Sequence, residues 1–151
     1  MKTSAIYLSL FLLFGLSSGC TKEVEPEMAL EPEPSIKILS VAPTTIKEFD
    51  ENVVVTLEYE DGDGDLGFEH PDSNALRVWD DRLENPDFYF VPPLSPVGEE
   101  ISIRGTLEIR LNGTFIIGNG QSESTRFALK IKDRSGNWSN EVTTPIITIT
   151  Q

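Results

Sequence analysis

Apolar and polar residues alternate with a period of two along most of the chain from residue 35 onward, which is the pattern of strands with one buried face. The alternation is clearest in 53–60, 107–111 and 127–132. Helical periodicity does not recur. Four further strands are expected, at 36–41, 76–79, 88–91 and 142–150. The pattern therefore predicts an all-β domain of about seven short strands.

Turn signals separate these segments. Clusters of Gly and Pro lie at 62–67, 92–98 and 118–120, where the chain must change direction. Asn112-Gly113 is a preferred pair for a two-residue turn, so a tight hairpin is expected after the strand that ends at Leu111. Short antiparallel strands joined by such turns fit a β-sandwich with Greek-key connections.

The last part of the chain resembles known domains. Residues 133–142 read Asp-Arg-Ser-Gly-Asn-Trp-Ser-Asn-Glu-Val, similar to the D-x-x-G-N-x-S turn that joins the last two strands of immunoglobulin-like and fibronectin-type domains. The resemblance implies an immunoglobulin-like antiparallel β-sandwich for residues 35–151. Cys20 is the only cysteine, so the inter-sheet disulfide of antibody domains is absent.

The first residues have the composition of a secretory signal. Lys2 precedes an uncharged run, 5–16, which is shorter than the roughly 20 residues of a membrane-spanning helix. Small residues then lead to Cys20, and this order resembles the signal peptide of bacterial lipoproteins. The resemblance implies that residues 1–19 are removed and that Cys20 is lipidated on its sulfur and its new amino group. Several acyl chains together would anchor the protein in a membrane.

Residues 20–34 are expected to form an acidic linker. The stretch 21–34 contains five Glu and three Pro, a composition that cannot bury a core and that extends through charge repulsion. The run Lys22-Glu23-Val24-Glu25 resembles the acidic export tags of surface lipoproteins in polysaccharide-foraging Gram-negative bacteria. It implies an outer-membrane lipoprotein exposed at the cell surface, and a plain spacer on a periplasm-facing protein is the alternative.

The charge balance excludes some partners. The chain has 12 Lys and Arg against 25 Asp and Glu, a formal net charge of −13. Nucleic-acid binding and polybasic attachment to a membrane are therefore not expected. His70, the only histidine, lies in a polar loop beside Pro71, and no nucleophile-elbow motif is present. We expect no enzyme, although paired carboxylates of a hydrolase would become visible only in space.

The segment 60–72 is the most informative in the chain. Asp61, Asp63 and Asp65 alternate with glycines, which allow a tight curl. Ca²⁺ takes six to eight oxygen ligands at about 2.3–2.6 Å, so such a curl can gather carboxylates around it. Asp72 matches the last ligand position of an EF-hand loop, but this loop follows a strand pattern. A D-x-D-x-D calcium loop on a β-scaffold is expected, and a solvated turn is the alternative.

A second loop is expected beside the first. In the immunoglobulin arrangement, the loops after the second and sixth strands lie at the same end of the sandwich. An oxygen of Asp133 or Asn137 should then come within roughly 8 Å of the acidic loop, close enough to share one ion. The complete set of candidate metal ligands is Asp61, Asp63, Asp65, Asp72, Asp133 and Asn137.

Two interpretations are open for a group of five aromatic residues, which are Trp79, Phe88, Tyr89, Phe90 and Trp138. They can stack against sugar rings, or they can fill the core of a small sandwich. Most are expected in the core, with Tyr89 and Trp138 exposed. The candidates for ligand stacking are Trp79, Tyr89 and Trp138.

Together these features predict a non-enzymatic, lipid-anchored cell-surface module. It would bind Ca²⁺ as a structural ion and mediate interaction with a protein or a glycan. One alternative is a carbohydrate-binding module of a glycan-uptake system. Another is a plain structural lipoprotein without a metal.

Overall fold

The computed structural model describes residues 30–151. The expected signal peptide (1–19), Cys20 and the acidic run 22–25 lie outside the described residues. Within 30–151 the chain forms strands, turns and bends without any helix. Accordingly, this part contains no helix with the length and apolar character needed to cross a bilayer.

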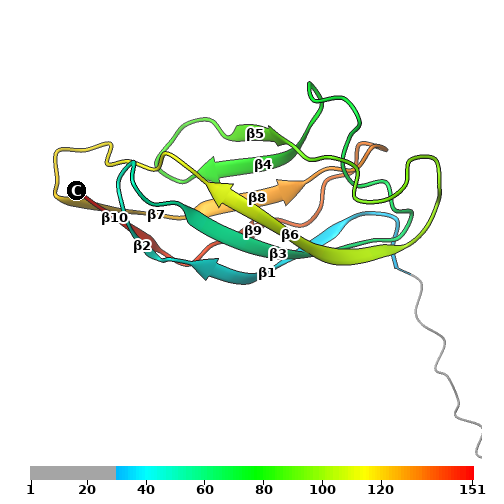
Figure 1. Ribbon diagram of the computed structural model, residues 1–151, viewed down its shortest axis with the longest axis horizontal. Coiled ribbons are helices and arrows are strands. Elements are labelled where there is room, and N and C mark those ends of the chain that lie inside the picture. The colour runs from blue at the N-terminus through cyan, green and yellow to red at the C-terminus, as the bar shows by residue number, and fades with distance from the viewer. Residues whose placement is uncertain (1–29) are drawn as a thin grey trace, which may run out of the picture.

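Ten strand segments make up the domain (Figure 1). They are β1 (Ser35–Ala42), β2 (Thr45–Lys47), β3 (Val53–Asp61), β4 (Asn74–Asp80), β5 (Asp87–Phe90), β6 (Ile103–Leu111), β7 (Ser122–Thr125), β8 (Phe127–Ile131), β9 (Val142–Thr143) and β10 (Ile147–Thr150).

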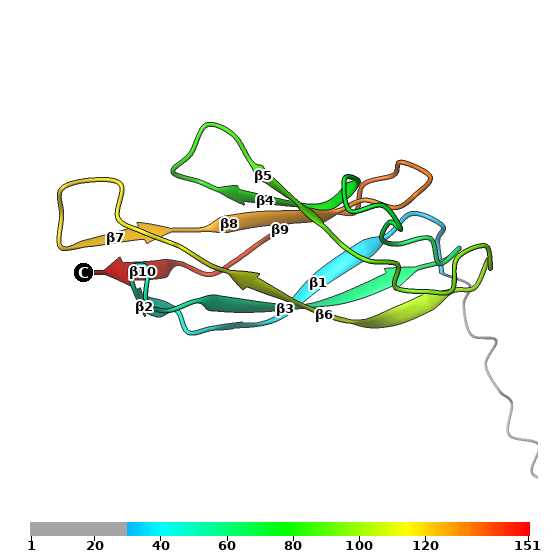
Figure 2. The ribbon, with the colours of Figure 1, turned by 45° about the horizontal axis from the view of Figure 1, so that its top comes forward.

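The segments form sheets that pack in two layers (Figure 2). One sheet has the order β1-β3-β6, the other has the order β5-β4-β8-β9, and a short sheet, β2-β10-β7, extends the assembly at one end. All pairings are antiparallel except that of β2 with β10. The predicted all-β sandwich of antiparallel sheets is confirmed.

The ten segments follow seven strand paths, as the sequence predicts. Short breaks interrupt three paths, between β1 and β2, between β7 and β8, and between β9 and β10. The second path, β3, and the sixth, β7–β8, lie in different sheets, as they do in the immunoglobulin arrangement. This topology brings the loops that follow these two paths to one end of the domain.

The core between the layers is filled almost entirely by aliphatic side chains. Alternation along β3 turns Val53, Val55 and Leu57 inward, and each is at most 1% exposed. Burying one such side chain contributes about 1.5–3 kcal/mol. Tyr59 and Phe127 are the only aromatic residues among the buried hydrophobic ones of 30–151.

The expectation that most aromatic residues fill the core is wrong. Five of them are between 37% and 48% exposed: Trp79, Phe88, Tyr89, Phe90 and Trp138. The exposure of Tyr89 and Trp138 is as predicted. The physical reason lies in β5, whose Asp-Phe-Tyr-Phe sequence forms an edge strand with β4 as its one partner. Aliphatic residues of the central strands already occupy the interior.

The tight hairpin expected at Asn112-Gly113 is also absent. Gly113 has a φ of 67°, as a turn requires, but β6 pairs with β3 and with no strand that follows it. Beyond the turn, Thr114 is buried, and its carbonyl oxygen accepts a hydrogen bond from the Phe49 amide, 3.2 Å away. The chain therefore crosses here toward the other sheet.

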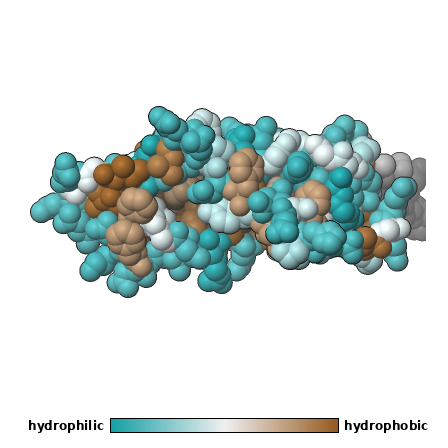
Figure 3. Space-filling model, turned by 90° about the horizontal axis from the view of Figure 1, so that it is seen from above, coloured by the Kyte–Doolittle hydropathy of each residue, from teal (hydrophilic) through white to brown (hydrophobic). Residues whose placement is uncertain are grey.

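An apolar patch lies at the end of the molecule where β7 and β10 are found, seen at the left of Figure 3. The rings of Phe49 and Phe115 stack there, with centroids 5.5 Å apart and an interplanar angle of 7°. Both rings are exposed, as is the neighbouring Ile117. The acidic loop occupies the opposite end of the sandwich.

Candidate metal centre

Asp61 is placed by the alternation of β3. The same phase that directs Val55, Leu57 and Tyr59 into the core continues to Asp61, the last residue of the strand. As a result this carboxylate is fully buried, with 0% exposure. A charged side chain in a core position is costly unless a partner compensates it.

The following turn bends the chain around the Asp61 carboxylate. The Asp65 amide donates a hydrogen bond to Asp61 Oδ2 at 2.8 Å. Gly64 has a φ of 72°, and a methyl group there would collide with the carbonyl oxygen of Ile101. Gly62 donates a hydrogen bond of 2.9 Å to the carbonyl oxygen of Glu31, so the chain before β1 also packs against the turn.

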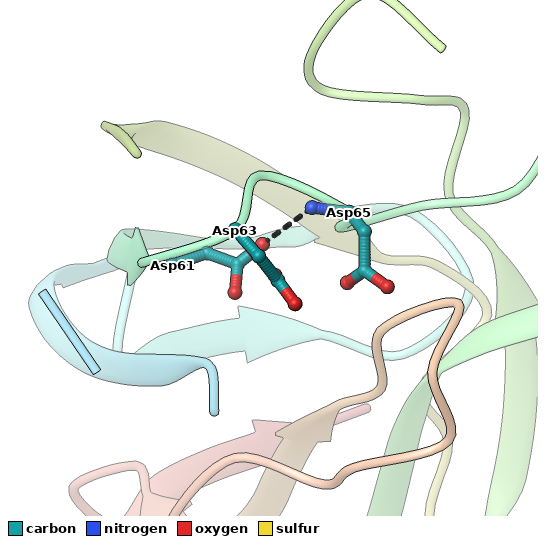
Figure 4. A group of neighbouring side chains, drawn as sticks. All are labelled: Asp61, Asp63 and Asp65. Carbon is teal, nitrogen blue, oxygen red and sulfur yellow. Dashed lines mark hydrogen bonds between the residues drawn. The ribbon is translucent and has the colours of Figure 1, made fainter. Parts of the chain in front are cut away.

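The turn gathers three carboxylates on one side of the loop (Figure 4). One oxygen from each of Asp61, Asp63 and Asp65 lies within 4.8 Å of the other two. The Oδ1 atoms of all three are buried and have no hydrogen-bond partner in the described part of the chain. No ion pair found between residues 30 and 151 includes any of the three. The cluster could hold a metal ion through oxygen ligands alone.

The electrostatic state of the cluster is visible in Asp61. Burial and the negative charges of Asp63, Asp65 and Asp133 together raise its pKa to about 6, against the lowering effect of the Asp65 amide. A divalent cation placed among these oxygens would reverse the electrostatic effect and favour the ionised forms.

The loop after β8 packs directly against the acidic loop, at the end where the sequence predicts it. Ser135 donates from its amide and its hydroxyl to Asp65 Oδ2, at 2.9 and 2.8 Å. The Arg134 amide donates to the Asp65 carbonyl oxygen at 3.1 Å. Leu66 forms a β-bridge with Asp133. These contacts fix Asp65, and therefore one wall of the cluster.

Asp133 is fully buried and holds its own loop together. Its Oδ1 accepts a 2.7 Å hydrogen bond from the Asn137 amide, and its Oδ2 accepts one of 2.9 Å from the Asn137 side chain. Asp133 thus acts on the cluster as a nearby negative charge, which contributes to the raised pKa of Asp61. Asn137 is exposed, and its side-chain amide is directed to Asp133. Asp72 is exposed in the turn before β4 and lies outside the converging group.

The three candidate stacking residues lie apart from the metal cluster. Trp79 is on β4, and its indole N–H donates to the Leu83 carbonyl oxygen at 2.9 Å. Tyr89 is on the edge strand β5, opposite Leu76. Trp138 follows the loop after β8 and is bridged to Lys132. The three rings do not share one sheet face, since Tyr89 lies opposite the inward-facing Leu76 whereas Trp79 is in the outward phase of β4.

The sequence interpretation missed a further buried carboxylate, that of Asp80, at the opposite end of the sandwich. Asp80 is the last residue of β4 and is 9% exposed. The Arg82 guanidinium lies 2.6 Å from Asp80 Oδ2, and the Thr125 hydroxyl donates to Asp80 Oδ1 at 2.6 Å. The inward phase of Leu76 and Val78 continues to Asp80, and this pattern is the signal that could have found it.

Hydrogen bonding gives Asp80 the opposite electrostatic character from Asp61. Burial would raise its pKa, but the hydrogen bonds from Arg82 and Thr125 outweigh burial and lower it. A cleft of about 120 Å³ beside it is also lined by Asp87 and Tyr89. Because Asp80 stays ionised and paired, it has no proton to give as a general acid.

Comparison with known proteins yields no match: no family model, no curated protein and no solved structure is significantly similar to this chain. Functional inference therefore rests on the geometry of these residues.

Proposed function

We propose that this protein is a non-enzymatic, lipid-anchored β-sandwich module that binds Ca²⁺ through Asp61, Asp63 and Asp65. The observation that carries the proposal is a set of three carboxylates that bring one oxygen each within 4.8 Å of one another, and whose Oδ1 atoms are buried without hydrogen-bond partners. Buried carboxylate oxygens are normally paired or metal-bound, because leaving them without a partner costs several kcal/mol.

The donor chemistry favours calcium over other ions. All converging atoms are carboxylate oxygens, which are hard ligands suited to Ca²⁺ and Mg²⁺, whereas Zn²⁺ prefers Cys and His. Ca²⁺ accepts variable geometry and larger ligand numbers, while Mg²⁺ demands a near-ideal octahedron and keeps most of its waters. A curled loop with three carboxylates, and with the further negative charge of Asp133 nearby, suits the larger ion.

The role of the ion in this proposal is structural. Calcium bound only to the folded state adds RT ln(1 + [L]/Kd) to the free energy of unfolding, about 2.7 kcal/mol at one hundred times Kd. It would join the turn after β3 to the loop after β8, which already meet at Asp65 and Ser135. Extracellular calcium modules have Kd values of about 10⁻⁴–10⁻³ M, matched to the external concentration.

The anchor and the location are supported by the N-terminal sequence. The short uncharged run before Cys20 and the acidic residues after it are similar to those of exported outer-membrane lipoproteins. The domain would stand at the cell surface and present its exposed side chains to a protein or a glycan. Replacing Cys20 by Ser should move the protein from the detergent phase to the aqueous phase in a Triton X-114 partition of cells that express it.

Thermal unfolding tests the metal site. The midpoint of the wild-type domain should rise by several degrees in millimolar Ca²⁺ relative to chelator, and by less in Mg²⁺. The Asp63→Asn variant should lose this response, whereas Asp72→Asn, which removes an exposed acid outside the cluster, should keep it. Equal wild-type midpoints in Ca²⁺ and in chelator would refute the calcium site.

A further inference from the structure

The outward face of β8 is basic, although the chain as a whole is strongly acidic. Along this strand Phe127, Leu129 and Ile131 are buried, so the residues between them face outward. Lys130 and Lys132 share this outward phase with Arg126 and Ala128. Arg126, Lys130 and Lys132 thus place three cations along β8 and its two flanking residues. In a protein with a formal net charge of −13, this is a local reversal of charge.

Neighbouring strands add a cation and aromatic rings to the same face. Residues directly opposite each other in an antiparallel pair lie on one face of the sheet. Arg77 of β4 is opposite Lys130, and Phe88 of β5 is opposite Arg77. Trp79 of β4 is opposite Ala128. We call this surface the basic aromatic face; its residues are Arg77, Trp79, Phe88, Lys130, Lys132 and Trp138.

Trp138 completes the face at the end near the acidic loop. It is bridged to Lys132, whose Nζ lies 5.5 Å from the centroid of the Trp138 ring and 5.8 Å from that of Phe68. The ring of Phe88 lies 6.5 Å from that of Trp138. Lys132 is therefore held by cation–π contacts, with its charge beside exposed aromatic surface.

The two lysines make no direct ion pair within residues 30–151. Arg77 is paired with Glu141, but neither Lys130 nor Lys132 takes part in any of the ion pairs found between residues 30 and 151. The Lys132 ammonium thus stands beside the exposed ring of Trp138, and Lys130 shares the sheet face with Phe88, with Arg77 between them. This arrangement is complementary to a ligand that carries both negative charge and apolar ring faces.

We propose that the basic aromatic face binds an acidic polysaccharide, a chain of sugars with carboxylate groups. The carboxylates would pair with Lys130 and Lys132, and the C–H faces of the sugar rings would stack on Trp138, Phe88 and Trp79. Trp79 already donates its indole N–H to Leu83, so it offers its ring rather than a hydrogen bond. The five residues from Ala128 to Lys132 span about 13 Å, enough for an oligosaccharide.

The charge pattern favours a glycan over other polyanions. A double-stranded nucleic acid carries two phosphates per base pair, about one charge for each 1.7 Å of helix axis, and the acidic remainder of the domain would repel so dense a charge. A uronic-acid chain carries at most one carboxylate per sugar. At physiological ionic strength the Debye length is about 8 Å, so the local cations act on such a ligand while more distant acids are screened.

Binding of short oligogalacturonates tests the proposal, with the methyl esters of the same oligosaccharides as the matched neutral probe. Isothermal titration calorimetry in chelator, which prevents gelling of the ligand by calcium, should show binding of the acids and at least tenfold weaker binding of the esters. Rising salt should weaken binding of the acids.

Variants locate the binding surface. Lys132→Gln and Trp138→Ala should each weaken binding of the acids at least tenfold. Lys37→Gln, on the opposite sheet, and Phe115→Ala, at the far end, should leave it unchanged. Melting curves of every variant confirm that the domain is folded. For a variant that fails to fold, the ester comparison on the wild-type protein still decides the question.

Three outcomes overturn the proposal: no binding of the acids, equal binding of acids and esters, or equally strong binding of poly-glutamate or single-stranded DNA with the same dependence on Lys132. The proposal is independent of the calcium site. The melting midpoint of the glycan-free protein in Ca²⁺ and in chelator separates the two, because absent glycan binding in chelator with a retained calcium effect on that midpoint overturns only the glycan proposal.

Discussion

Two aspartates end successive strand paths at opposite ends of the sandwich, and the side chains that face them carry opposite charge. Asp61 and Asp80 both continue the inward phase of their strands, and both are buried. Asp80 meets the guanidinium of Arg82, which lowers its pKa against the effect of burial. Asp61 meets two further carboxylates, and its pKa is raised to about 6. The chain supplies a cation at one end and leaves a place for one from solution at the other.

The largest expected effect is at Asp80, whose counter-charge is supplied by Arg82 of the same chain. Asp80→Asn removes the bidentate partner of the largely buried Arg82 and leaves it paired with Glu123 alone, and breaking a buried ion pair from one side costs at most about 3–5 kcal/mol. Urea unfolding should show this loss equally in Ca²⁺ and in chelator. The double variant Asp80→Asn/Arg82→Met should recover part of the loss. A cost below about 1 kcal/mol would mean that the pair contributes no more than a surface salt bridge.

The next effect is the pH dependence of the metal-free protein at the other end. The folded pKa of Asp61, about 6, lies above its unfolded value near 3.9. Stability from this group is therefore full below about pH 4 and is lost as the pH rises through 6. The loss amounts to about 3 kcal/mol, at roughly 1.4 kcal/mol for each pH unit between the two values.

Asp61→Asn is the matched control for this pH dependence. Asn can still accept the Asp65 amide at its oxygen, so in chelator the variant should lose less stability than wild type between pH 5 and pH 8. In saturating Ca²⁺ the wild-type trend should reverse, because protons compete with the ion as the pH falls. Parallel pH profiles for wild type and variant in chelator would show that Asp61 is not the titrating group.

The smallest effect concerns the contact between the two loops. Ser135→Ala removes the hydroxyl that donates to Asp65 Oδ2 and leaves the backbone donor in place. One hydrogen bond to a charged acceptor contributes about 1.5–3 kcal/mol. Because Ser135 is exposed and water can replace its hydroxyl, the free energy of unfolding should fall by only about 1 kcal/mol. Ser124→Ala, at an exposed position on β7, should change it little. If both variants behave alike, the hydroxyl contact does not stabilise the loop.

The sequence predicts those features that depend on local periodicity. The segments 53–60 and 127–132 alternate because one face of each strand packs on the core, and β3 and β8 are found there. The spacing of Asp61, Asp63 and Asp65 likewise shows that a glycine-rich turn can gather three carboxylates. The pairing of the loops after β3 and β8 follows once the immunoglobulin arrangement is assumed.

Features that depend on distant contacts could not be predicted in this way. The Asp80 cluster joins residues separated by 45 positions, with Thr125 donating to Asp80, and nothing in a local pattern announces such a partner. Phe88 and Phe90 of β5 are expected inward from the sequence because aromatic side chains ordinarily fill the core of a small sandwich. Their exposure depends instead on β5 being an edge strand and on aliphatic residues filling the interior first.

The hydrogen bond from Gly62 to the Glu31 carbonyl oxygen has a mechanical consequence. The chain joins β1 at this end of the molecule, and Gln151 lies at the other (Figure 1). Tension between the two ends would act along β1, whose pairing with β3 extends from Ser35 opposite Glu60 to Ala42 opposite Val54. Because ladder bonds run across the strands, such a pull shears them together instead of unzipping them one at a time. An ion bound at the turn beside Gly62 would therefore raise the force needed to shear β1 away from β3.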